Sequence, residues 1–187
     1  MGSALVPIEG LFLLPNSIQA QIIVKGICRN ETATIEASMS GIQISDEVVD
    51  YYSTDFKKQK KVVYFRCALN PGGTQIVLKD SVEDRDAVGV YQEKTPEESK
   101  RRFEAMKDKL TVDDPCFIVF DFWFRKGERV ENKMGVISWI SDECPVKKRM
   151  VYGSVKDALT RKLDGTKSIQ ANDKGDLEFD SVVSVFK

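Results

Sequence analysis

The sequence contains no histidine among its 187 residues. Histidine is the side chain whose ordinary pKa places its change of charge between about pH 5 and pH 8. Its absence excludes mechanisms in which histidine is a general base, activates a nucleophile or ligates a metal. A cysteine nucleophile would also lack its usual activating base. Because no other catalytic constellation stands out, the residues indicate a binding protein and not an enzyme.

Cysteine is scarce, and long apolar runs are missing. The four cysteines are far apart and form no Cys-x-x-Cys pair: Cys28, Cys67, Cys116 and Cys144. This spacing fits neither a zinc site nor a compact disulfide framework, so we interpret them as reduced thiols of a cytosolic protein. No apolar run approaches the ~18 residues of a transmembrane helix. The apolar stretch at 11–15 has prolines around it and no basic residue before it, which makes it a poor signal peptide.

A large excess of charge of either sign is missing as well. Lys and Arg together number 28 and Asp and Glu 29, so the formal net charge is -1. This balance argues against nucleic-acid binding driven by bulk charge and leaves room only for a local basic patch. The acidic groups at 83–86 and 113–114 lie beside turn residues, so we interpret them as solvated loop charge. We therefore expect no metal and no cofactor.

The first 38 residues differ in composition from the rest of the chain. They hold few charges and two prolines, whereas the sequence from Met39 onward is dense in charge and cleanly patterned. We place a domain boundary there, between a poorly ordered or weakly packed extension at 1–38 and one domain at 39–187. Two interpretations of the extension stay open. It is a real segment, such as an isoform-specific exon that masks a site, or it is sequence upstream of a true start at Met39.

Turn residues and apolar periodicity divide the rest of the chain into helices and strands. Ser45 is a good helix N-cap, with Asp46 and Glu47 at the positive end of the helix dipole. Three helices are predicted to begin at Ser45, Thr95 and Pro145, and a weak fourth candidate covers 175–187. Two strand pairs are predicted at 61–69 with 74–80 and at 116–124 with 133–141, the second pair joined by a charged loop at 125–132. This order indicates an α/β (α+β) fold with a mixed sheet sandwiched between helices.

The long predicted helix carries three cations in its first turn, Lys147, Lys148 and Arg149. Cations are unfavourable at this end of the helix dipole, by ~0.3–1 kcal/mol each. An acidic partner is the simplest explanation, and the alternative is a solvated charge run whose small cost is tolerated. Arg149 and Lys156 share a face with the small Gly153 between them, so a partner surface could approach the helix backbone closely. The apolar stripe of this helix is predicted to comprise Val146, Met150, Val155, Leu159 and Leu163.

The sequence of this helix, "CPVKKRMVYGSVKDALTRKL", resembles the long actin-binding helix of the actin-depolymerising factor/cofilin family. The family pattern is A-P-[LV]-[KR]-x-[KR]-M-[IV]-Y-A-S-S-K-D-A-[IL]-x-x-x-L. Further segments resemble the family in the same order: "SGIQISDEVV", "KKQKKVVYFRCAL", "CFIVFDFWF", "GVISWISDECP" and "IQANDKGDLEFDSVV". The resemblance runs from Ser40 to about Val183, and the chain is identified on these motifs as a member of the family.

The resemblance implies a single ADF-homology domain, with a mixed sheet of about five strands and helices on both faces. It implies a monomeric, non-enzymatic protein of the cytoplasm and actin cytoskeleton. Its partners would be G-actin and F-actin, with the ADP form preferred, and its effect would be the severing and depolymerisation of filaments. The run "KKQKK" at 57–61 resembles the family's nuclear-import stretch, and a solvated helix end explains it about as well.

The resemblance also assigns residues to sites. The monomer-binding site would consist of Ser40, Gly41, Val146, Lys147, Arg149, Met150 and Ser154, with Met150 as the apolar anchor. The filament-binding site would use Arg125, Lys126, Arg129 and Lys133. Phosphoinositides would bind Lys147, Lys148 and Arg149. Ser40 falls on the family's regulatory phosphoserine, where a phosphate would add negative charge beside cations that the partner needs.

The sequence departs from the family pattern at three places. Gly153-Ser154-Val155 replaces Ala-Ser-Ser, and Phe117 replaces an arginine at a strand start. The tail at 184–187 reads Ser-Val-Phe-Lys where the filament site needs charged residues. Monomer binding is therefore the firmer expectation. The alternative is a regulatory protein of the glia maturation factor type, which does not sever filaments.

Overall fold

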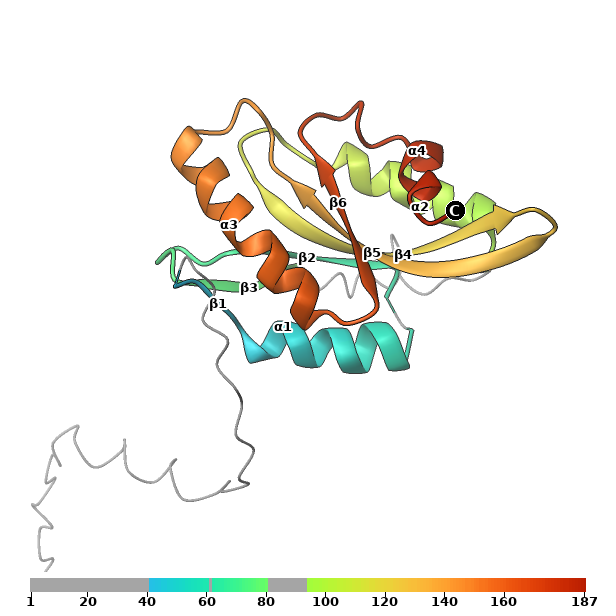
Figure 1. Cartoon of the computed structure of the whole chain (residues 1–187), viewed down its shortest axis with the longest axis horizontal. Helices are drawn as coiled ribbons and strands as arrows, with labels where there is room; N and C mark the ends of the chain where they lie inside the picture. Colours follow the sequence, from blue (N-terminus) through green and yellow to red (C-terminus); the bar gives the residue numbers. More distant parts are fainter. Residues whose placement is uncertain (1–40, 61, 81–93) are drawn as a thin grey trace, which may run out of the picture. The chain divides into compact units, whose positions relative to one another are not determined.

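The structure, a computed structural model, describes residues 41–60, 62–80 and 94–187. The proposed extension at 1–38, and Ser40 with it, lies outside the described residues. The described chain forms a six-stranded mixed sheet in the order β1-β3-β2-β4-β5-β6 (Figure 1). The strands are β1 (Gln43–Ile44), β2 (Tyr64–Leu69), β3 (Gln75–Asp80), β4 (Cys116–Lys126), β5 (Arg129–Trp139) and β6 (Thr166–Ala171). The two outer pairs, β1 with β3 and β5 with β6, are parallel, and the inner pairs are antiparallel.

The middle of the sheet is buried on both faces, as the apolar run of β4 predicts. Residues 116–122 of β4 are all buried, and their side chains point alternately into two separate clusters. Ile118, Phe120 and Phe122 belong to one cluster, and Phe117 and Val119 belong to the other. A strand covered on both faces lacks a polar alternation, which explains the continuous apolar sequence.

Helices cover both faces of the sheet, as predicted. The helices are α1 (Asp46–Tyr51), its continuation η1 (Tyr52–Lys58), α2 (Pro96–Asp108), α3 (Val146–Lys162) and α4 (Phe179–Ser184). α2 and α4 contribute Phe103, Met106 and Phe179 to one cluster. α1, η1 and α3 contribute to the other cluster, for example through Val48 and Leu159. Figure 1 shows α2 and α4 side by side, and α1 lies below α3 in this view.

The first helix begins as the sequence predicts and then changes its winding. The Ser45 side chain accepts a hydrogen bond from the Val48 N–H at 3.4 Å, as expected of an N-cap. From Tyr52 the helix continues as a π-helix, in which the Gln59 N–H donates to the Thr54 carbonyl at 2.9 Å. Tyr52 and Phe56 are both buried, so the π-turn keeps two aromatic side chains on the core side.

The predicted loop at 125–132 is wrong for most of its length. β4 continues to Lys126 and β5 starts at Arg129, so the turn consists of residues 127 and 128 alone, with a φ of 62° at Gly127. This positive φ favours glycine. The polar residues at 125–126 and 129–132, which suggested a loop, belong to the two strands. They are exposed or half-buried, because this end of the hairpin extends beyond the core.

Two strands were not predicted, and both lie at the edges of the sheet. β1 is two residues long, and in β6 only Ile169 and Ala171 are buried. Such short or mostly polar segments give no clear period of two. The expected sheet of about five strands is thus one of six in the described part of the chain.

The last two helices differ in detail from the prediction. In α3 the buried side chains are Tyr152, Val155 and Leu159, followed by Leu163, whereas the predicted stripe members Val146 and Met150 are exposed. α4 is shorter than the candidate at 175–187, because residues 172–176 form a turn held by the Asp173 and Asp176 carboxylates. In the described part of the chain, no helix is both long and apolar enough to cross a membrane.

Candidate functional site

The first turn of α3 presents apolar and cationic side chains to solvent. The helix starts after Pro145 with no side-chain cap and no acidic residue in its first turn. Lys147 and Lys148 are exposed there. Val146 is 61% exposed and Met150 is 71% exposed, although large apolar side chains are usually covered. An exposed methionine between cations suits an adaptable binding surface.

A groove runs along this face of α3. It has a volume of about 440 Å³, and its described lining consists of Ile140, Asp142, Val146, Arg149, Met150, Gly153, Lys156, Gln170 and Asn172. We call it the α3 groove. Gly153 lies on the same face as Arg149 and Lys156, as the helical spacing predicts, and a Cβ atom there would meet nothing within 4 Å. The helix backbone is therefore open to a partner at Gly153.

Two tyrosine hydroxyls fix α3 against the rest of the fold. The Tyr152 hydroxyl accepts a hydrogen bond from the Leu69 N–H of β2 at 2.9 Å. The Tyr52 hydroxyl donates to the Asp164 carbonyl just after α3 at 2.6 Å. Burial, and after it the neighbouring Asp164 carboxylate, raises the pKa of Tyr52 to about 12. The exposed face of α3 is thus held in place by one contact in the first half of the helix and one just after its C-terminal end.

Three cations of α3 have partners within the protein. Arg149 Nη1 lies 3.0 Å from Asp142 Oδ1, and Lys156 Nζ lies 3.3 Å from Gln170 Oε1. Lys148 Nζ lies 3.4 Å from the Asp113 carbonyl oxygen. The charged groups of Arg149 and Lys156 thus contact the turn before α3 and strand β6, respectively. Positive charge therefore lies on both sides of the open backbone at Gly153.

Most of the predicted monomer-binding residues lie together on α3. Met150 and Ser154 are one turn apart, and the Ser154 hydroxyl donates to the Val151 carbonyl at 2.7 Å. Gly41 is exposed and has a φ of 70°, but it lies before β1 and not on α3. The binding roles of all these residues, and of Ser40, stay predictions. The sequence analysis did not predict three residues that line the α3 groove, Asp142, Gln170 and Asn172. Asp142 lies in the turn before α3, Gln170 on β6 and Asn172 just after β6, so helical spacing does not connect them with α3.

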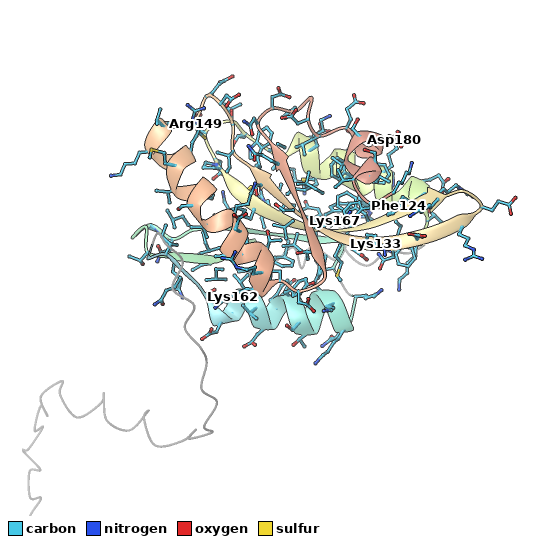
Figure 2. The ribbon with its side chains drawn as sticks, in the orientation of Figure 1. Phe124, Lys133, Arg149, Lys162, Lys167 and Asp180 are labelled. Atoms are coloured by element: carbon cyan, nitrogen blue, oxygen red, sulfur yellow. The ribbon has the colours of Figure 1, made fainter. Side chains whose placement is uncertain are left out.

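The predicted filament-binding cations lie on the β4–β5 hairpin. Register places Lys126 opposite Arg129, and Lys133 opposite Phe122, so these three cations share the face that α2 and α4 cover. By alternation Arg125 belongs to the other face, yet its Nη2 atom lies 3.6 Å from Glu97 Oε1 at the start of α2. Figure 2 labels Lys133 right of centre, on the β4–β5 hairpin, and Arg149 at the upper left, near the start of α3. The two predicted sites are separate surfaces.

The tail at 184–187 has a packing role. Phe186 is 7% exposed, and its ring centroid lies 5.3 Å from that of Phe122 and 6.0 Å from that of Phe124. Lys167 Nζ donates to the Val185 carbonyl at 2.7 Å. Phe186 therefore packs the end of the chain against β4, in a segment where the family pattern has charged residues.

Two lysines of the basic run at 57–61 contact the fold. Lys57 Nζ lies 3.2 Å from the Asp164 carbonyl oxygen, and Lys60 Nζ lies 3.3 Å from Asn132 Oδ1. Lys60 also lies 5.7 Å from the ring centroid of Trp123. Both contacts lie at the surface, and the nuclear-import role of the run stays a prediction.

A buried polar cluster in β4 escaped the sequence analysis. Asp121 is 6% exposed and accepts hydrogen bonds from Trp123 Nε1, at 3.1 Å, and from Asn132 Nδ2. Burial raises the pKa of the Asp121 carboxyl, and these two hydrogen bonds oppose the shift. The one signal in the sequence is a single aspartate within the most apolar run.

The chain is similar to known proteins over the region described above. Residues 41–187 match the family of cofilin/tropomyosin-type actin-binding proteins. The cofilin of Eremothecium gossypii is 32% identical over 149 residues, which cover 78% of this chain and 92% of that protein. The actophorin of Entamoeba histolytica is 28% identical over 80% of this chain and 97% of its own length. The crystal structure of Streptomyces griseoflavus cofilin superposes with a TM-score of 0.61 at 25% identity, covering 77% of this chain and 96% of that one.

Proposed function

Because the chain belongs to the family of cofilin/tropomyosin-type actin-binding proteins, we propose that it binds actin monomers and filaments and promotes the severing and depolymerisation of filaments. The observation that carries this proposal is the α3 groove, where Val146 and Met150 are exposed between cations. Apolar side chains supply contact area, and the surrounding Lys147, Arg149 and Lys156 supply complementarity to an acidic surface.

The proposed mechanism is one of binding alone. The exposed face of α3 would enter a cleft of actin, with Met150 as the adaptable anchor, while the open backbone at Gly153 allows close approach. A protein that binds the ADP form of the subunits more tightly than the ATP form shifts the equilibrium toward that form by its difference in affinity. Binding through α3 and the β4–β5 hairpin together would engage two filament subunits.

The test combines a binding and a filament assay. We expect the full chain to bind fluorescently labelled ADP-actin monomers more tightly than ATP-actin monomers, to pellet with filaments and to sever them under the microscope. A chain that neither binds ADP-actin nor pellets with filaments would contradict the proposal.

The alternative is a regulatory protein of the glia maturation factor type, which does not sever. The buried Phe186 at the tail favours it, because fewer charges remain there for the filament contact. Normal monomer binding without severing would select this alternative.

Regulation would act on the same surfaces. Phosphoinositides would occupy Lys147, Lys148 and Arg149, and phosphate on Ser40 would weaken actin binding. We also propose that the protein is a monomer of the cytoplasmic actin cytoskeleton. Vesicles containing phosphoinositides should compete with actin, and vesicles of neutral lipid should not.

A further inference from the structure

Asp142 is the one acidic residue among the described residues that line the α3 groove. It lies in the turn before α3, and its Oδ1 atom accepts hydrogen bonds from two elements. Arg149 Nη1 of α3 donates at 3.0 Å, and Asn172 Nδ2, just after β6, donates at 3.4 Å. We infer that Asp142 is the counter-ion of Arg149 in the free protein. A carboxylate of the partner takes the place of the Asp142 carboxylate on binding. This inference rests on the proposed function.

The pair is poorly suited to be permanent. The Asp142 side chain is 70% exposed and that of Arg149 is 38% exposed, so water weakens the attraction. Within the described residues, Arg149 donates to Asp142 through Nη1 alone, whereas arginine binds a carboxylate best through two parallel N–H groups. Arg149 Nε is buried and has no hydrogen-bond partner within the described part of the chain. A partner carboxylate that took two N–H groups of Arg149 would therefore replace Asp142 at little cost.

The charge of Asp142 also opposes the approach of such a partner. It places a negative charge in a groove whose other charged lining residues, Arg149 and Lys156, are positive. Like charges at an interface disfavour association and slow the encounter. Asp142 thus lowers the affinity of the α3 groove for acidic surfaces and sets how strongly acidic a partner must be.

The test is the isosteric Asp142→Asn variant of the full chain, measured against ADP-actin monomers. We expect about two- to fivefold tighter binding, mostly through a faster association rate, with the gain shrinking as salt is raised. Asp142→Glu keeps the charge and should bind like the wild type. Asp108→Asn removes an exposed charge on α2, which packs on the other face of the sheet, and should change nothing.

Failure of this inference differs from failure of the proposed function. If the wild type binds and Asp142→Asn binds equally or more weakly, the counter-ion role is wrong. If the wild type does not bind, the proposed function is wrong, and the inference falls with it. A measurement without actin adds a separate check: in the free protein, Asp142→Asn should shift the Arg149 Nε–Hε signal in nitrogen-15 NMR. An unchanged signal would show that the two side chains do not interact in solution.

Discussion

The Ser99 hydroxyl of α2 accepts a hydrogen bond from the Trp123 N–H of β4 at 3.0 Å. Trp123 lies just beyond the end of the pairing between β4 and β2. Two residues earlier on β4, the Asp121 N–H still donates to the Val63 carbonyl before β2, at 3.0 Å. A side chain on the helix thus replaces the strand neighbour and satisfies a backbone donor that the sheet no longer pairs. Ser99 is fully buried, which makes this contact a structural junction between α2 and the sheet.

Two fully buried serines should respond oppositely to the same change. Ser99→Ala leaves the Trp123 N–H without its hydroxyl acceptor and should lower the free energy of unfolding by about 1–2 kcal/mol. Ser138 is also 0% exposed, but its hydroxyl has no partner within the described residues, so Ser138→Ala should be neutral or stabilising. Urea unfolding of both variants measures the difference, and equal losses would contradict the assignment of these hydrogen bonds.

The stability should depend on pH through Tyr52. The pKa of Tyr52 rises from an ordinary value near 10 to about 12 in the folded state. A raised folded pKa means that the stabilisation is complete below pH ~10 and is lost as the pH rises toward ~12. Wild type should therefore lose more stability than Tyr52→Phe across this range. Because lysines also titrate there, the quantity to measure is the difference between the two proteins in urea unfolding, and a constant difference would argue against the shift.

The cations of the first turn of α3 should matter for binding and not for folding. Replacing Lys147 and Arg149 together by Ala should weaken ADP-actin monomer binding at least about tenfold. The thermal midpoint should stay equal or rise, because cations are unfavourable at that end of the helix. Arg161→Ala with Lys162→Ala removes the same charge from the other end of α3 and is the matched control. Unchanged affinity of the first variant would show that α3 is not the binding helix.

Gly153 should be replaceable by alanine. Glycine in a helix interior costs ~0.8–1 kcal/mol relative to alanine. A Cβ atom at Gly153 would meet no atom within 4 Å, so Gly153→Ala should raise the free energy of unfolding by about that amount. As a methyl group is small, we expect actin binding to stay within about twofold, while the larger Gly153→Leu should block the α3 groove. Equal binding by the leucine variant would exclude close approach of a partner at this position.

Much of the fold follows from local patterns in the sequence. The N-caps Ser45 and Thr95, the apolar run of β4 and the turn at 70–73 are all found where they were predicted. Each depends on residues within one or two turns of chain, so no distant contact is needed to recognise it. The polar edge strand β6 depends instead on its pairing with β5, which no local pattern reveals.

The order and spacing of neighbouring residues were enough to predict where the first three helices begin, the central strands, the family and the cationic first turn of α3. The tertiary structure alone decided which side chains share a surface. It placed Asp142, before α3, and Asn172, after β6, together at Arg149, and it put Val146 and Met150 outside and Tyr152 inside. The reason is physical: a helical period gives the spacing of a stripe, but only packing against the sheet decides which stripe is buried and which meets a partner.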